Sequence, residues 1–466
     1  MKKIAMFFFL FILTGSLFGQ EIEGQWNGIL KFQGSQLRIV LTINKTDTGF
    51  VSSMDSPDQG AKDIPVNITT FEDSVLKVEV TSLGAKYEGV LTDESQIVGE
   101  LKQMGITIPL TLTRVISDKA TVIRPQNPVE PYPYHSEEVK FINPKDQTVL
   151  AGTLTLPKKS GKFPVVVLIS GSGAQNRNEE LMDHKPFLIL ADQLTRSDIA
   201  VLRYDDRGTA QSTGDFSKAT TSILATDVEA AIRYLLTRNE IDKKKIGLIG
   251  HSEGSSIASI VAAKCKDVRF IVLMAGPGLR GEELLLLQEE KIGKVSGVTE
   301  ASLSRRLALN KGAFDIIVNT TNPDVMGKEL RDYLLKKVSD MPIEEKPEGI
   351  SDELIVQNVI DQFTTPWFLE FLKYDPSLIL RKVKCPVLAL NGSKDLQVSA
   401  KENLTAIKTN LDKGGNDEVT IREYPNLNHL FQDCTTGSPA EYGVIQQTIS
   451  SQVLNEISRW ILRKTN

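Results

Sequence analysis

The stretch KKIGLIGHSEGSSIASIVAAKC, residues 244–265, decides how the second half of this chain folds. It begins with a short apolar run that is typical of a buried parallel strand, and it ends with small and apolar residues that favour a helix packed on a sheet. Between them, the pattern Gly250-x-Ser252-x-Gly254 places a serine at a sharp turn. The strained backbone of such a turn leaves no room for larger side chains two residues to either side. The stretch therefore predicts strand, turn and helix, with Ser252 at the tip.

Strands and helices alternate on both sides of this stretch, over residues 137–466. Strand candidates include FPVVVLIS, IAVLRYDD, VRFIVLMAGPG and CPVLALNGSKD, and the closing VIQQTISSQVLNEISRWILRK is an amphipathic helix candidate. The pattern predicts an α/β domain with a doubly wound, mostly parallel sheet. The alternation stops at about 279–378, where only helical patterns occur. We therefore expect a helical cap inserted into the sheet domain.

Residues 20–115 follow a different pattern. Segments such as LRIVLTI, KYEGVLT and ITIPLTLTR are rich in β-branched residues and alternate apolar with polar positions. They predict a small all-β N-terminal domain. A Pro-rich linker is expected at 116–136, because four prolines there favour extended chain over a helix or a central strand. These prolines are Pro125, Pro128, Pro131 and Pro133.

The first twenty residues, MKKIAMFFFLFILTGSLFGQ, have the layout of a secretory signal: two lysines, about ten apolar residues, then small and polar ones. We assign residues 1–19 as a signal peptide and expect an exported protein, periplasmic or extracellular. The apolar run is too short to span a bilayer comfortably, so no stable membrane anchor is expected after cleavage. The chain has three cysteines, an odd number, so disulfides cannot be its main framework.

Composition and motifs argue against several classes of binding partner. With 54 basic and 59 acidic residues the formal net charge is −5, which argues against nucleic acid as a partner. The loop SGSG, residues 170–173, lacks the third glycine of a dinucleotide-binding fingerprint. The sequence also has no cluster of His, Cys and carboxylate residues at metal-ligand spacing. No cofactor and no metal are expected.

A serine becomes a nucleophile only when a base takes its proton, and that base needs an acid to hold its tautomer. The chain has four histidines. His251 adjoins the serine and should point away from its hydroxyl, His135 lies in the predicted linker, and His184 comes early in the domain. His429, in YPNLNHLF, follows the last strand candidate and is the best candidate for the base.

Asp395 is the candidate acid, because it follows the apolar strand of VLALNGSKDLQV and a glycine turn. The order Ser252, Asp395, His429 is the one expected when the serine lies on a strand-to-helix turn. The oxygen that forms on an attacked carbonyl needs two backbone N–H donors. Glu253, directly after the serine, is one candidate donor, and Ser172 in the SGSG loop is the other.

Six motifs follow one another along residues 136–466: SGSGAQNRNE, YDDRGTAQSTGDF, GHSEGS, PWFLEFLKYDP, CPVLALNGSKDLQV and NHLF. In their wording and their order they resemble the α/β hydrolase superfamily, in particular exported bacterial members of the serine aminopeptidase-like and dienelactone hydrolase-like groups. The resemblance implies hydrolysis of carboxylic esters, thioesters, lactones or sometimes peptides. SGSG stands where many relatives carry His-Gly, which affects the shape of the loop more than its backbone donors.

Two further motifs have structural interpretations. In YDDRGTAQST, we expect Arg207 to tie loops together through hydrogen-bonded ion pairs with its neighbours Asp205 and Asp206. The apolar stripe of PWFLEFL could line an acyl pocket, but a buried interface with the sheet domain is the preferred interpretation. The aromatic residues of that stripe are Trp367, Phe368 and Phe371.

The sequence thus predicts a secreted serine hydrolase that cleaves small-molecule carboxylic esters through an acyl-enzyme intermediate. One alternative is a serine exopeptidase or aminopeptidase, in which Glu344 and Glu345 would hold the amino terminus of the substrate. A thioesterase is a further alternative of the same chemical kind. A third, of a different class, is a non-catalytic protein whose β domain binds glycan or envelope components.

Overall fold

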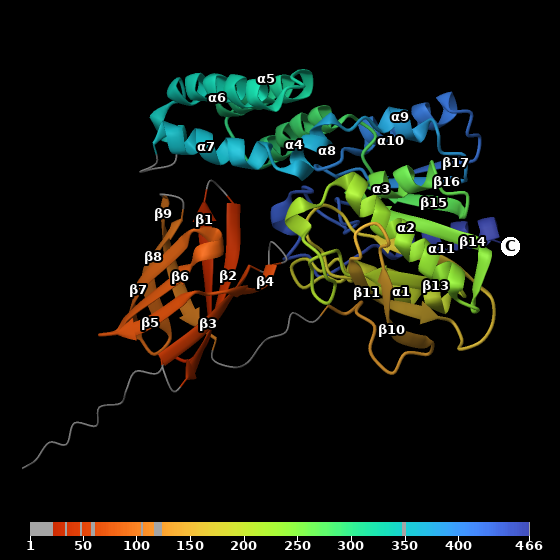
Figure 1. The fold of residues 1–466 in the computed structure, drawn as a ribbon, viewed down its shortest axis with the longest axis horizontal. Coiled ribbons are helices and arrows are strands. Elements are labelled where there is room, and N and C mark those ends of the chain that lie inside the picture. The colour runs from red at the N-terminus through yellow and green to blue at the C-terminus, as the bar shows by residue number, and fades with distance from the viewer. Residues whose placement is uncertain are drawn as a thin grey trace, which may run out of the picture. The chain divides into compact units, whose positions relative to one another are not determined.

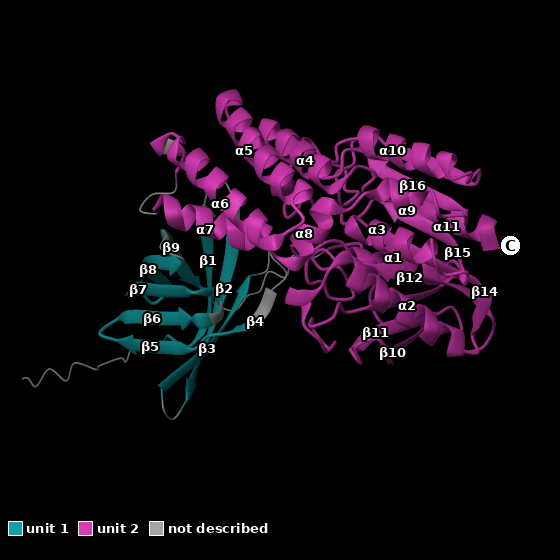
Figure 2. Ribbon diagram, turned by 45° about the horizontal axis from the view of Figure 1, so that its top comes forward, with its two compact units in different colours: residues 1–56, 62–119 teal, residues 57–61, 120–466 magenta. Residues whose placement is uncertain are grey.

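The computed structural model describes residues 22–32, 35–46, 49–56, 61–103, 106–115, 124–346 and 351–465. The expected signal peptide, residues 1–19, lies outside them. The chain divides into two compact units. Figure 2 shows the first, residues 1–56 and 62–119, in teal and the second, residues 57–61 and 120–466, in magenta.

The first unit is all β, as the sequence predicts. Its described strands form one sheet in the order β4-β3-β2-β1-β9-β8-β7-β6-β5, and the pairs from β3 to β5 along this order are antiparallel. The strands, labelled in Figure 1, are β1 (Gly24–Phe32), β2 (Ser35–Thr46), β3 (Gly49–Ser56), β4 (Ala61–Pro65), β5 (Ile68–Glu72), β6 (Val75–Val80), β7 (Ala85–Asp93), β8 (Gln96–Gln103) and β9 (Ile106–Arg114).

The core of the first unit lies on one face of this sheet, because alternate residues of a strand point to opposite faces. Along β7, for example, buried and exposed positions alternate from Ala85 onward. Trp26 is fully buried, and its indole N–H donates to the carbonyl oxygen of Ile22 at 2.9 Å. The sheet is curved: β3 and β5 are not neighbours in strand order, yet the hydroxyls of Ser52 and Thr69 are hydrogen-bonded to each other.

The second unit is built on a mostly parallel sheet in the order β10-β11-β13-β12-β14-β15-β16-β17, which confirms the predicted sheet type. Only the pairs β10/β11 and β11/β13 are antiparallel among the described strands. The strands are β10 (His135–Ile142), β11 (Val149–Leu156), β12 (Phe163–Ile169), β13 (Ala200–Tyr204), β14 (Ile241–His251), β15 (Val268–Met274), β16 (Val387–Gly392) and β17 (Val419–Tyr424).

Helices cover both faces of this sheet. Helices α1 (Pro186–Arg196) and α11 (Ser451–Thr465) share one apolar core with the sheet. Helices α2 (Thr221–Thr237), α3 (Glu253–Ala262) and α10 (Ala400–Lys413) share the core on the other face. Because both faces are covered, the central strands are apolar along their length rather than alternating. Together with the strand order, this is the α/β hydrolase fold.

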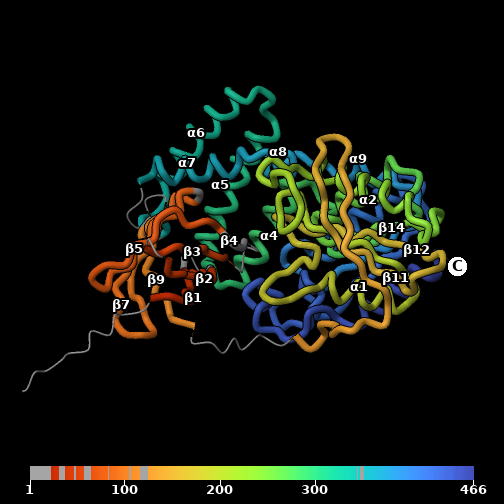
Figure 3. Tube along the Cα trace, turned by 60° about the horizontal axis from the view of Figure 1, so that its bottom comes forward, coloured from red at the N-terminus to blue at the C-terminus, as the bar shows by residue number. Residues whose placement is uncertain are grey.

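Between β15 and β16 the chain forms helices α4 to α9, here called the helical insertion. They are α4 (Gly281–Val295), α5 (Glu300–Asn319), α6 (Pro323–Ser339), α7 (Asp352–Phe363), α8 (Pro366–Lys373) and α9 (Pro376–Leu380). Figure 3 shows α5, α6 and α7 next to one another, and they share an apolar core that includes Phe314, Leu330 and Phe363. No helix within the described ranges is long and apolar enough to cross a membrane.

The described part of the predicted linker, from residue 124 on, is fastened to the second unit. The guanidinium of Arg124 donates to three backbone carbonyls of that unit at 2.6–2.9 Å. The hydroxyl of Tyr134 donates to the carboxylate of Asp192 on α1 at 3.0 Å. Strand β10 begins at His135, inside the range 116–136. Prolines favour extended chain, and an extended chain can pack along a domain surface as well as connect two domains.

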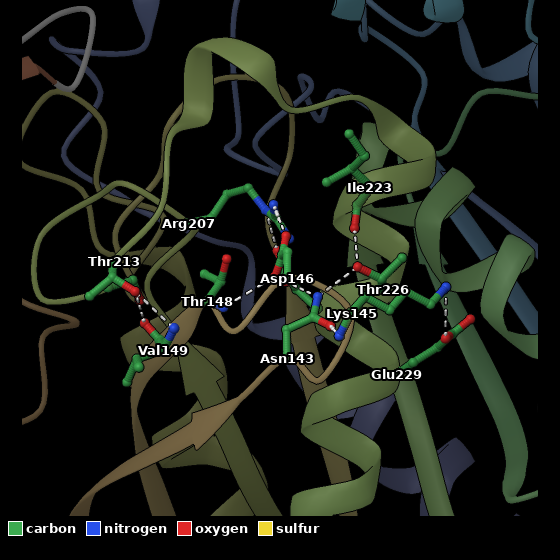
Figure 4. A network of polar contacts seen from close by, with 12 residues as sticks. Asn143, Lys145, Asp146, Thr148, Val149, Arg207, Thr213, Ile223, Thr226 and Glu229 are labelled. Carbon is green, nitrogen blue, oxygen red and sulfur yellow. Dashed lines mark hydrogen bonds and ion pairs between the residues drawn. The ribbon is translucent and has the colours of Figure 1, made fainter.

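Arg207, in the loop after β13, ties three segments together, although its partners differ from those expected. Its Nε and Nη2 donate to the Asp227 carboxylate of α2 at 2.8 and 2.7 Å. Its Nη1 donates to Asp146, between β10 and β11, at 2.7 Å. Figure 4 shows Arg207 beside Asp146, with Asn143 close by. Its sequence neighbours Asp205 and Asp206 instead accept hydrogen bonds from the loop after β12.

This ion pair generates a stability prediction. In Arg207→Met the carboxylate of Asp227, 1 % exposed, loses its cation, and breaking such a buried pair typically costs about 3 kcal/mol. For a unit of this size that lowers Tm by about 4 °C, measurable by calorimetry. The matched control is Lys311→Met, because the Lys311–Asp315 pair is exposed. An equal loss of Tm in both variants would contradict the structural role of Arg207.

Candidate functional site

Ser252 lies at the tip of the turn between β14 and α3, in a strained conformation with positive φ, at φ 51° and ψ −122°. Non-glycine residues rarely adopt such a conformation, and it persists only where the surroundings impose it. Here the turn packs tightly: a Cβ at Gly250 would lie 2.1 Å from the carbonyl oxygen of Gly254, and one at Gly254 would lie 2.2 Å from that of Ile169. Both positions therefore require glycine.

Asp395 and His429 meet at the carboxyl end of the sheet. Asp395 follows β16, His429 follows β17, and these strands are parallel neighbours. The Nδ1 atom of His429 lies 2.8 Å from Oδ2 of Asp395, and both side chains are buried. The other carboxylate oxygen accepts the backbone N–H groups of Gln397 and Val398 at 2.9 and 2.8 Å. With its Nδ1 proton directed at Asp395, the imidazole keeps Nε2 free to accept a proton.

Ser252 and His429 line one cavity of about 260 Å³. Its wall also includes the loop after β12, with Gly171 and Ser172, and Glu253 at the start of α3. The helical insertion contributes Leu284, Leu285, Gln288, Trp367 and Phe371. The structure thus brings all five candidate residues to one place: four in the cavity wall, and Asp395 hydrogen-bonded to His429.

Two backbone N–H groups are available beside Ser252. Glu253 is the first residue of α3, where N–H groups have no partner within the helix. In the loop after β12, Gly171 donates its N–H to Oε1 of Glu179 at 2.7 Å. Among the described residues, neither the N–H of Ser172 nor the N–H of Glu253 donates a hydrogen bond to a backbone oxygen. These two amides can therefore donate to an oxygen that becomes negative when a carbonyl is attacked.

Asp206 holds the loop after β12 in shape. Its carboxylate accepts the hydroxyl of Ser170 at 3.0–3.1 Å and the backbone N–H of Gln175 at 3.0 Å. Burial raises the pKa of Asp206 well above its ordinary value. The sequence instead predicts an ion pair between Asp206 and Arg207. An acidic residue after a strand indicates where its side chain lies in the fold, but not which group it pairs with.

The side chain of Glu253 links the turn to helices α2 and α8. Its carboxylate accepts the Thr221 hydroxyl at 2.6 Å and the indole N–H of Trp367 at 2.9–3.0 Å. Burial raises the pKa of Glu253. Trp367 stacks on Phe371 with ring centroids 5.0 Å apart, and both line the cavity, whereas Phe368 is buried inside the helical insertion. The expected interface with the sheet domain is made by Trp367, through Glu253, and by Phe371, which packs with Val398, whereas Phe368 packs within the helical insertion.

The other histidines have other surroundings. His135 begins β10 and is partly exposed. His184 is buried, with Nδ1 2.8 Å from the Thr448 hydroxyl, and burial lowers its pKa. The ring of His251 is hydrogen-bonded to the carboxylate of Glu179, a residue that the sequence analysis did not single out. No group of side chains in the described part of the chain is arranged to hold a metal ion.

Residues 184–433, more than half of the chain, match the family model described as serine aminopeptidase, S33. Esterase EstD of Thermotoga maritima is 26% identical over 325 residues, which cover 68% of this chain and 67% of that protein. Human acyl-coenzyme A thioesterase 1 is 24% identical over 183 residues, 39% of each chain. A solved Pyrococcus furiosus esterase has a TM-score of 0.43 and 14% identity, covering 72% of this chain and 95% of its own. By its family match, the chain belongs to the serine aminopeptidase S33 family of the α/β hydrolases.

Proposed function

We propose that this protein is an exported serine hydrolase that cleaves carboxylic esters of small molecules. The observation that carries the proposal is the 2.8 Å hydrogen bond between His429 and the buried Asp395, at the cavity that also contains the strained Ser252. The similarity to an esterase, which covers 68% of this chain, supports an ester substrate over a thioester, because the similarity to a thioesterase covers only 39% of it. Export rests on the pattern of residues 1–19 alone.

The reaction follows from the roles of these groups. As the Oγ atom of Ser252 attacks the ester carbonyl, His429 takes the hydroxyl proton on Nε2, and Asp395 stabilises the imidazolium. The N–H groups of Ser172 and Glu253 bind the oxyanion of the tetrahedral intermediate. His429 then protonates the leaving alcohol, which leaves an acyl group on Ser252. A water molecule that gives its proton to His429 releases the acid and restores the serine.

The helical insertion would act as a cap that selects the acyl group. Leu284, Leu285, Trp367 and Phe371 give the cavity wall an apolar part. A pocket of this kind binds mainly by burying apolar surface, with a few polar groups for orientation. The cavity of about 260 Å³ therefore favours esters of small, apolar acyl groups.

The carboxylates of the cavity wall argue against the exopeptidase alternative. An exopeptidase needs a free carboxylate to hold the substrate's amino group, and the described wall contains Glu179 and Glu253. Both are engaged, Glu179 by His251 and Glu253 by Trp367. Glu345 pairs with Arg305 in the helical insertion, and the side chain of Glu344 lies outside the described residues.

Replacing the nucleophile tests the proposal directly. Ser252→Ala should lower kcat for a short p-nitrophenyl ester by at least about 10⁴-fold, because no acyl-enzyme forms. A fluorophosphonate probe should label the native protein and leave the variant unlabelled. Ser304→Ala, at an exposed position of α5, is the control and should keep full activity. Native protein that neither hydrolyses esters nor takes up the probe would support the non-catalytic binder instead.

Asp395→Asn tests the hydrogen bond to His429. The Oδ1 position of residue 395 accepts two backbone N–H groups, so the asparagine must turn its NH₂ toward Nδ1 of His429. That forces the proton onto Nε2, which then cannot accept the serine proton, and kcat should fall by about 10³–10⁴-fold. Asp433→Asn, exposed in the loop that holds His429, is the matched control. Equal activities of the two variants would remove Asp395 from the mechanism.

A further inference from the structure

A second buried polar pair lies beside the candidate catalytic residues and has no part in the proposed reaction. His251 adjoins Ser252 in the chain and is 6 % exposed. Its Nδ1 lies 2.9 Å from Oε1 of Glu179, and its Nε2 lies 3.0 Å from the backbone carbonyl oxygen of His429. The rings of His251 and His429 have centroids 4.8 Å apart.

Both partners of His251 accept hydrogen bonds. A backbone carbonyl has no proton to give, and neither has an ionised carboxylate. Each ring nitrogen therefore needs a proton of its own, and only the imidazolium form of His251 has two. Burial by itself lowers the pKa of His251, but the charge of Glu179 and the two hydrogen bonds outweigh it, so the pKa is raised above its ordinary value.

The same oxygen of Glu179 reaches the loop that carries Ser172. Oε1 accepts the backbone N–H of Gly171 at 2.7 Å in addition to the ring of His251. This loop lies close to the nucleophile, because a Cβ at Gly171 would be 3.2 Å from Cβ of Ser252. His251 is therefore connected to three parts of the site. It adjoins Ser252 in the chain, it contacts the loop of Ser172 through Glu179, and it is hydrogen-bonded to the backbone carbonyl of His429.

We propose that His251, as an imidazolium paired with Glu179, is a positioning residue that keeps His429 and the loop of Ser172 correctly placed relative to Ser252. The proposal rests on the serine hydrolase function above. Both side chains also line the cavity, but neither gives or takes a proton in the proposed reaction, so their loss should change the alignment of the reacting groups more than the affinity for substrate. A displacement of about 1 Å in such groups can lower the rate by about 100-fold.

Three variants test this role. His251→Phe removes both donors, and it should lower kcat by about 100-fold with KM within about 2-fold of the native value. His251→Gln keeps a single donor and Glu179→Gln keeps the acceptor for Gly171 without the charge, so each should lose about 10-fold. The rate of fluorophosphonate labelling should fall in parallel with kcat. His135→Gln, at the partly exposed start of β10, is the control and should keep native activity.

The outcomes separate this proposal from the proposed function. Labelled, active native protein and inactive Ser252→Ala establish the serine hydrolase whatever the His251 variants do. The positioning role is overturned if His251→Phe keeps kcat within about 2-fold of the native value, or if the activity of its folded fraction is unchanged. Should His251→Phe fail to fold, the same criteria apply to His251→Gln and Glu179→Gln.

The charge on His251 can be measured directly, since the chain has only four histidines. In protein labelled with ¹⁵N-histidine, the signal that disappears in His251→Gln should be mainly that of an imidazolium at pH 6.5, because the pKa of His251 is raised above that ordinary value. A neutral ring would overturn the proposal. The titratable groups that face His251 are Glu179, His429 and Asp395.

Stability should follow the same proton. The folded-state pKa of His251 is raised, so its stabilisation is complete below its unfolded pKa of about 6.5 and is lost as pH rises through the folded value. The Tm difference between native protein and His251→Gln should therefore be larger at pH 6 than at pH 9. A difference that grows with pH would contradict a charged His251.

Discussion

The strained, positive-φ backbone at Ser252 is the constraint on which the site depends. It is imposed by close contacts among β12, β14 and α3, where Gly250, Gly254 and Ile169 approach one another with no space for a Cβ. The chain passes from strand β14 to helix α3 within the single residue Ser252. Its hydroxyl therefore lies where the strand ends and helix N–H groups are both within reach, which is the general location of reacting groups in open α/β sheets.

Buried ionisable groups surround this turn, and each has a partner from another segment. Asp395 holds His429, Asp206 holds the loop of Ser172, and Glu253 joins the turn to Trp367 in the helical insertion. Burying such groups is costly unless hydrogen bonds satisfy them. Once satisfied, they restrict the geometry, because any shift leaves a buried polar atom without its partner. The site is thus kept rigid by polar contacts as much as by apolar packing.

The two units contribute differently to this arrangement. Every residue of the candidate site comes from the second unit, where the helical insertion supplies the apolar wall of the cavity. The first unit is a curved antiparallel sheet with its own core around Trp26. It has the alternation of a sheet with one face toward a core, and it carries no residue of the proposed chemistry.

Local sequence determined the kinds of elements and the candidate residues. Periodicity separates an all-β part from an α/β part, and the glycine pattern around Ser252 indicates the turn, because the interactions that form them lie within a few residues. Chain order was enough to propose Asp395 and His429. Partner choice was decided only by tertiary structure: Arg207 pairs with Asp146 and Asp227 rather than with its neighbours. The bond between His251 and Glu179 joins residues 72 positions apart, and no local pattern distinguishes Glu179 from the adjacent Glu180. Side-chain direction at the end of a strand depends on the packing of distant segments, which the sequence does not show.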